Sequence, residues 1–215
     1  MRLAVTVRRA NLGLMRAAYI GMGANLPSRA GPPEATLTGA VARLSSLGCV
    51  THRSSLYSTE PVGFAAQPRF VNAVIALETD LEPRQLLEGL LGIEQEFGRD
   101  RSAGIPNGPR TLDLDILLLG SVQLHEPGLE IPHPRLTART FVLLPLSEIA
   151  PSIVPAGQRE SVSQLLHHLV AKSEREPSHE EDAAIRIHWP DWIAGPGGAG
   201  AAPARAGPRD RDRRR

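Results

Sequence analysis

Residues 108–120 read GPRTLDLDILLLG and place two aspartates inside an apolar run that has the length of a buried strand. In an extended strand the leucines and the isoleucine that alternate with these aspartates point to one face. Asp113 and Asp115 share the other face, with Cα atoms roughly 6.5–7 Å apart. Two carboxylates held this close repel each other unless a cation or water lies between them. The stretch therefore predicts a strand with one apolar face and one paired acidic face.

The hydrophobic pattern around this stretch alternates between strand and helix spacing. Each expected helix is bounded by a proline, a serine cap or a following glycine. Strands are expected at 17–23, 49–59, 70–79 and 111–119, and helices at Leu37–Leu47, Pro83–Phe97 and Val162–Val170. The order β-α-β-β-α-β predicts an α+β fold, a ferredoxin-like sheet with covering helices and long loops at one edge.

The 215 residues are enough for one domain with a core and loose ends. Residues 1–15 contain no acidic side chain, and we expect them to be a dispensable or mis-started extension, with Met15 as the natural start. Residues 16–172 are expected to form the folded domain. Residues 173–215 end in a run rich in Gly, Ala, Pro and Arg, which predicts a disordered tail.

Charge and composition argue against several classes of partner. The net charge of +1 provides no overall attraction to nucleic acid or to anionic membranes. A single cysteine, Cys49, fits a reducing compartment. No apolar run approaches the roughly 18–20 residues of a membrane span. We therefore expect a cytoplasmic monomer that binds neither nucleic acid nor membrane.

Arginines precede the paired aspartates in a turn-rich loop, FGRDRSAGIPNGPR. Arg99, Arg101 and Arg110 could bind phosphate oxygens in bidentate fashion. The chain's one lysine, Lys172, has no glycine-rich loop before it, so a P-loop is excluded. Magnesium is bound by one or two carboxylates together with phosphate oxygens, and two such ions can clamp an in-line displacement. Spacing alone leaves a metal–phosphate site and a solvated acidic edge strand equally open.

Two further side chains admit both a structural and a functional interpretation. His133 is held between prolines in IPHPRL, where it could be structural or could donate a proton to phosphate. Asn72 interrupts the apolar strand FVNAVIALET and needs a polar partner, either a backbone group or the edge of a bound heterocycle. The glycines of GMGAN at 21–25 lack the third glycine of a dinucleotide loop and favour a strand-to-loop turn.

Four stretches taken together resemble the 6-hydroxymethyl-7,8-dihydropterin pyrophosphokinase family of the folate pathway. They are AYIGMGANL, SSLYSTEPVGFAAQPRFVNAVIALET, NGPRTLDLDILLLG and IPHPRLTARTFVLLPLSEIAP. The resemblance covers about residues 17–171. It implies a ferredoxin-like fold and the transfer of pyrophosphate from ATP to the hydroxymethyl oxygen of the pterin, with release of AMP. It also implies two Mg²⁺ ions, with ATP as co-substrate.

The resemblance also assigns roles to single residues. Asp113 and Asp115 match the metal ligands, and both act in catalysis with Arg99 and Arg110. The positions that match residues around ATP are Leu87, Glu94, Arg101, Asn107, Arg110, Ile116, His133 and Arg139. The positions that match residues around the pterin are Thr59, Pro61, Val62, Gly63, Phe70, Asn72 and Phe141.

The chain departs from the family pattern at Glu60, Ser102 and Asn107, where other members have proline, lysine and tryptophan. These departures put the details of loop closure in question rather than the reaction. Two alternatives are a binding module that holds ATP or pterin without turnover and another metal-dependent, nucleotide-using transferase. The nucleotide product distinguishes them, because AMP is expected only from pyrophosphoryl transfer.

Overall fold

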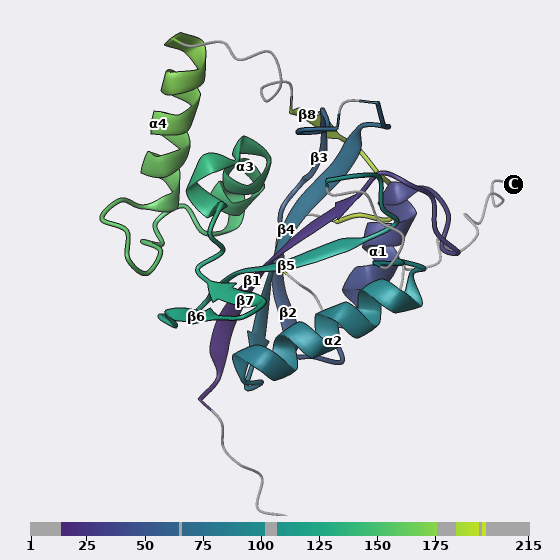
Figure 1. Cartoon of the computed structure of the whole chain (residues 1–215), viewed down its shortest axis with the longest axis horizontal. Helices are drawn as coiled ribbons and strands as arrows, with labels where there is room; N and C mark the ends of the chain where they lie inside the picture. The colour runs from purple at the N-terminus through teal and green to yellow at the C-terminus, as the bar shows by residue number, and fades with distance from the viewer. Residues whose placement is uncertain (1–13, 65, 102–106, 176–183, 194, 197–215) are drawn as a thin grey trace, which may run out of the picture.

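The computed structural model describes residues 14–64, 66–101, 107–175, 184–193 and 195–196 (Figure 1). The helices are α1 (Pro33–Leu44), α2 (Pro83–Glu96), the 3-10 turn η1 (Leu136–Ala138), α3 (Thr140–Ile149) and α4 (Val162–Arg175). The strands are β1 (Arg16–Ala24), β2 (Cys49–Arg53), β3 (Leu56–Thr59), β4 (Phe70–Thr79), β5 (Asp113–Leu119), β6 (Leu124–Glu126), β7 (Leu129–Ile131), β8 (Ile185–Ile187) and β9 (Gly195–Pro196).

The main sheet is antiparallel, with the strand order β5-β1-β4-β2-β9. The long strand β4 pairs with β1 along one edge and with both β2 and β3 along the other. The first four strands of the main sheet, β5-β1-β4-β2, have the order expected of a β-α-β-β-α-β chain folded as a ferredoxin-like sheet. The predicted fold class is therefore confirmed. The expected strand 49–59 divides into β2 and β3, because Ser54 and Ser55 leave the strand between them.

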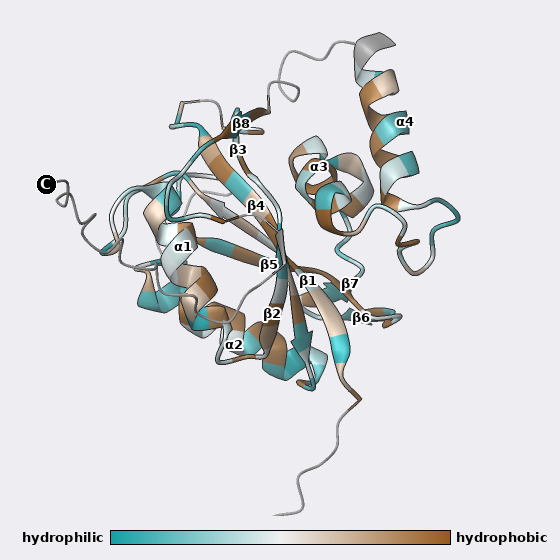
Figure 2. Cartoon of the chain, turned by 180° about the vertical axis from the view of Figure 1, so that it is seen from behind, coloured by the Kyte–Doolittle hydropathy of each residue, from teal (hydrophilic) through white to brown (hydrophobic). Residues whose placement is uncertain are grey.

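Helices cover both faces of the sheet (Figures 1 and 2). The first core lies between the sheet and α1 and α2, and includes Ile20, Leu37 and Leu90. The second lies between the sheet and α3 and α4, and includes Leu143 and Leu146. Figure 2 shows brown apolar residues along α1 and α2, and those of the first core are buried against the sheet. Alternation along β4 and β5 supplies both cores at once, which fixes the sheet as the central layer.

Several elements follow the sequence pattern closely. β4 occupies the expected residues 70–79, and α2 begins at Pro83 as expected. Gln85 completes a capping box with Glu82, and Gly98 ends the helix with a φ of 84°. The β6–β7 hairpin and α3 were not expected. α3 shows no amphipathic pattern, because it is buried between the sheet and α4 and is apolar nearly all round.

The expectation of a disordered tail after residue 172 is wrong for part of that segment. α4 continues to Arg175, β8 pairs with β3, and β9 pairs with β2. Trp192 is 8% exposed and packs in the first core, so this part of the chain buries enough apolar surface to fold. Residues 1–13, 176–183 and 197–215 lie outside the described residues. Among the helices in the described ranges, none has both the length and the apolar character needed to cross a membrane.

Candidate active site

The two aspartates lie at the start of β5, opposite glycines of β1. Asp113 pairs in register with Gly23, and Asp115 with Gly21. A Cβ at position 23 would approach Asn72 Oδ1 to 2.9 Å, so glycine is required for Asn72 to reach over the strand. The GMGAN motif is therefore the strand end that makes room for polar groups above the acidic face.

Asp113 is neutralised by arginines. Arg99 forms an ion pair with its Oδ1, and Arg110 Nη2 lies 2.8 Å from its Oδ2. Burial alone would raise the pKa of Asp113, but Arg110 and Arg99 hold it below its usual value. The structure thus brings together three of the four predicted catalytic side chains through direct contacts.

Asp115 stands in contrast to its neighbour. Within the described part of the chain, no hydrogen bond or ion pair reaches its carboxylate. Burial, together with repulsion from Asp113, raises the pKa of Asp115 to about 6. A carboxylate with this environment is stabilised by a bound cation.

Glu94, predicted near ATP, anchors two arginines to the strand. Its side chain is 1% exposed, and it accepts hydrogen bonds from Arg99 Nη1 at 3.2 Å and from Arg101 Nη2 at 2.6 Å. It also accepts the Leu114 N–H at 2.8 Å. Burial raises the pKa of Glu94, and the two arginines only partly offset this. The side chain therefore connects the arginine loop to β5.

A first cavity contains most of the predicted pterin residues. It is lined by Thr59, Glu60, Val62, Phe70, Asn72, Asn107, Arg110, Arg135, Arg139 and Phe141. Asn72 Nδ2 donates to Thr59 Oγ1 at 2.7 Å, which orients the amide at the wall. Pro61 and Gly63 lie in the adjoining loop outside this lining. A Cβ on Gly63 would lie 3.5 Å from the Asn107 side chain.

Arginines lie over both aromatic rings of this cavity. The Arg110 guanidinium is 4.7 Å from the centroid of Phe70, and that of Arg139 is 5.3 Å from Phe141. Asn107 and Arg139, both predicted near ATP, are thus placed beside the predicted pterin residues. Arg135 lines the same cavity and was missed, although it lies two residues beyond His133 in the same motif.

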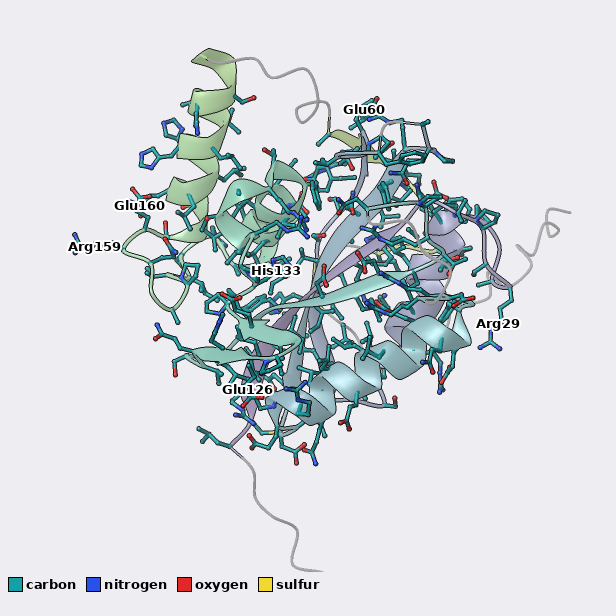
Figure 3. The ribbon with its side chains drawn as sticks, in the orientation of Figure 1. Arg29, Glu60, Glu126, His133, Arg159 and Glu160 are labelled. Atoms are coloured by element: carbon teal, nitrogen blue, oxygen red, sulfur yellow. The ribbon has the colours of Figure 1, made fainter. Side chains whose placement is uncertain are left out.

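A second cavity, of about 310 Å³, lies on the other side of Asp115. Three predicted ATP positions, Leu87, Ile116 and His133, line it. The β6–β7 hairpin contributes Glu126 and Leu129, which sequence reasoning missed because the hairpin was not expected. In Figure 3, His133 lies near the middle of the molecule and Glu126 at the hairpin. Glu94, Arg101, Asn107 and Arg139 are not among the residues that line this cavity.

His133 is neutral in this environment. Burial and the nearby Arg139 and Arg135 lower its pKa to about 4. Its Nδ1 accepts the backbone N–H of Arg135 at 3.1 Å, so the ring proton lies on Nε2. The imidazole Nε2–H can therefore donate one hydrogen bond to a ligand bound in the second cavity.

Asn25, which follows β1, connects the loop that contains Gln67 with the loop that contains Arg110. Neither Asn25 nor Gln67 was predicted as a site residue. Its Oδ1 accepts the Arg110 N–H at 2.8 Å, and its Nδ2 donates to Gln67 Oε1 at 3.0 Å. Gln67 Nε2 donates in turn to the Asn107 carbonyl at 2.9 Å. These bonds make the positions of the arginine loop and of the first cavity interdependent. In the sequence, only the glycines of GMGAN, the motif that ends at Asn25, pointed to this position.

Between the two cavities lies a third, smaller space lined by Asp113, Asp115, Arg110 and Arg139. Two ligand cavities that meet at carboxylates and arginines are typical of an enzyme that transfers a phosphoryl-type group between two small molecules. Residues 19–151 match the family model described as 7,8-dihydro-6-hydroxymethylpterin-pyrophosphokinase (HPPK). The chain belongs to this family, whose members are pyrophosphoryl-transferring enzymes of folate biosynthesis.

The sequence of this chain aligns with curated relatives over most of the relatives' length. The 2-amino-4-hydroxy-6-hydroxymethyldihydropteridine pyrophosphokinase of Pseudomonas aeruginosa is 44% identical over 146 residues, which cover 67% of this chain and 88% of the relative. The protein of the same name from Haemophilus influenzae is 43% identical over 161 residues, which cover 74% of this chain and 98% of the relative.

Solved structures support the fold. The HPPK-DHPS structure from Plasmodium falciparum superposes with a TM-score of 0.65 at 15% identity, over 84% of this chain. The chain spans about half of that longer protein, 50% of its length. This similarity concerns the fold alone.

Proposed function

We propose that this chain transfers the pyrophosphoryl group of ATP to the hydroxymethyl oxygen of 6-hydroxymethyl-7,8-dihydropterin in an Mg²⁺-dependent reaction. The observation that carries the proposal is the acidic face of β5, which lies where the two cavities meet. The pterin oxygen forms a bond to the β-phosphorus of ATP, and the bond from that phosphorus to the α,β-bridging oxygen breaks. AMP leaves, and the pterin diphosphate is the second product.

The donor set at this face fits magnesium. Among the described residues, no cluster of three or more His, Cys, Asp or Glu side chains could hold a metal ion. Magnesium commonly takes only one or two carboxylates and completes its shell with phosphate oxygens and water. Asp113 and Asp115 provide such a pair, and among the described residues no ion pair reaches Asp115, whose pKa is raised by burial and by Asp113. Two bound Mg²⁺ ions would neutralise the charge of the transferred group.

Arginines of the chain complement this charge. Arg99 and Arg110 already face Asp113, so they lie beside the position of the transferred group. Their planar guanidinium groups can bind phosphate oxygens in bidentate fashion and stabilise charge as AMP departs. Glu94 holds Arg99 and Arg101 in place, and this preorganisation avoids reorientation during the reaction.

Each cavity suits one substrate. We assign the nucleotide to the second cavity, where His133 Nε2–H donates a hydrogen bond and Leu87 and Ile116 contribute apolar contacts. We assign the pterin to the first cavity, where Asn72 reads its polar edge. We expect the pterin to stack between Phe70 and Phe141, and the guanidinium groups of Arg110 and Arg139, which lie over these rings, to bind phosphate oxygens.

The proposed enzyme acts in the cytoplasm as a monomer and does not bind nucleic acid or membranes. The net charge of +1 and the single cysteine support this part of the proposal.

The experiment follows nucleotide products with saturating ATP, a hydroxymethyl dihydropterin and titrated Mg²⁺. We expect AMP and pterin diphosphate in equal amounts, with loss of at least about 100-fold in Asp113→Asn and Asp115→Asn. Asp80→Asn, an exposed carboxylate outside both cavities, is the matched control. ADP as product would indicate an ordinary kinase, and binding without either product would indicate a binding module.

A further inference from the structure

The break between β2 and β3 is a polar junction inside the sheet. Ser54 is 1% exposed, and its N–H donates to the Val74 carbonyl while its Oγ accepts the Val74 N–H. The Ser54 carbonyl is reached from a distant part of the chain, because Trp192 Nε1–H donates to it at 2.8 Å. Loss of this donor would leave a buried carbonyl without its partner.

Glu148 at the end of α3 connects that helix to β3. Its Oε2 accepts the Ser55 N–H at 2.6 Å, and its Oε1 accepts the Tyr57 O–H at 2.6 Å. Burial alone would raise the pKa of Glu148, but these bonds and Arg186 hold it below its usual value. Phe141 lies in α3 and Thr59 is the last residue of β3, and both line the first cavity. The Glu148 carboxylate therefore links two walls of this cavity.

The segment 184–193 contacts both β3 and Glu148. Its strand β8 pairs with β3 in the register Leu56↔Ile187 and Tyr57↔Arg186, and Figure 1 shows β8 along the outer edge of β3. Arg186 forms an ion pair with Glu148 and donates to the Tyr57 hydroxyl at 3.3 Å. Trp192 anchors the same segment in the first core. The segment lies beyond residues 19–151, which match the family model.

We propose that segment 184–193 is part of the scaffold of the pterin site, with Arg186 and Trp192 as positioning residues that hold β3 and α3 at the separation the pterin needs. This inference rests on the proposed function of the first cavity. The nucleotide cavity is built from α2, β5 and the β6–β7 hairpin, none of which pairs with β8. Perturbation of the segment should therefore weaken pterin binding selectively.

The test uses the full chain and the variants Trp192→Phe and Arg186→Ala. Phenylalanine keeps an aromatic ring in the core and removes the donor to Ser54 together with part of the buried indole. Arg186 is 65% exposed, so its truncation leaves no cavity in the core. His188→Ala, an exposed change in the same segment, is the control. Calorimetry measures the Kd of 6-hydroxymethylpterin in saturating non-hydrolysable ATP analogue and Mg²⁺, and separately the Kd of the analogue.

We expect each variant to raise the pterin Kd by about tenfold, the effect of one lost hydrogen bond. The Kd of the ATP analogue should stay within about twofold of the parent, and the control should match the parent for both ligands. Hydrogen exchange of the Leu56–Thr59 amides should accelerate in both variants, because these amides belong to the strand that β8 covers.

Parental pterin affinity in both variants would overturn the inference and leave the proposed function intact. Equal weakening of both ligands would also overturn it, since the segment would then act on general stability. A parent chain that binds the ATP analogue but no pterin would refute the proposed function, and with it this inference.

Discussion

Asp113 and Asp115 should respond in opposite directions to loss of charge, because among the described residues arginines form ion pairs with Asp113 and not with Asp115. Burial and Asp113 raise the pKa of Asp115 from 3.8 to about 6. An acid with a raised folded-state pKa contributes its full stability below its unfolded pKa and loses that stability as pH rises through the folded value. The shift of about two units corresponds to at most about 3 kcal/mol. Partial solvent exposure reduces this to about 1–2 kcal/mol.

We therefore expect Asp115→Asn to increase the free energy of unfolding of the metal-free protein by about 1–2 kcal/mol at pH 8, with a rise in Tm of about 2–8 °C. At pH 4 the gain should disappear, because Asp115 is already protonated in the folded parent. Asp113→Asn should instead cost about 1–3 kcal/mol at pH 8, since it leaves Arg99 and Arg110 without this carboxylate.

The assay is urea unfolding with EDTA, followed by circular dichroism at pH 4 and pH 8, with Asp80→Asn as control. Asp115→Asn that is no more stable than the parent at pH 8 would refute the reasoning. A gain of equal size at both pH values would refute it as well, because repulsion and burial act only on the ionised form.

Three further outcomes are expected. Asn72→Ala should weaken pterin binding by about 1–3 kcal/mol and spare ATP, because it removes a positioned amide; equal losses in calorimetry would mark Asn72 as structural. His133→Ala should raise the Kd of ATP about tenfold, and the ratio of the variant's Kd to the parent's should stay constant between pH 6 and pH 8, since the pKa of His133 is about 4; a ratio that changes near neutrality would contradict this. Removal of residues 197–215 should leave the melting temperature unchanged, whereas removal of residues 176–215 should cost about 3–5 kcal/mol through loss of buried Trp192; calorimetric scans of equal Tm would contradict the second expectation.

Local signals explain which elements could be predicted. β4 and the start of α2 were expected at the residues where they occur, because alternation and Pro83 act within a few residues. The hairpin, α3 and the break at Ser54 carried no such signal. α3 in particular is apolar nearly all round, because both of its sides are buried.

The sequence alone predicted the acidic pair on one face of β5, the arginines before it and the family. The first two depend on residue types and spacings within one short stretch, and the family depends on four such stretches. The partners of these residues were not. Among the described residues, arginines form ion pairs with Asp113 and not with Asp115, and only the tertiary arrangement of Arg99 and Arg110 around β5 decides this. Glu94 meets Leu114 N–H across 20 residues, and Trp192 meets Ser54 across 138. Such contacts join segments that share no periodicity, so only the packing of the sheet against its helices and its C-terminal strands determines them.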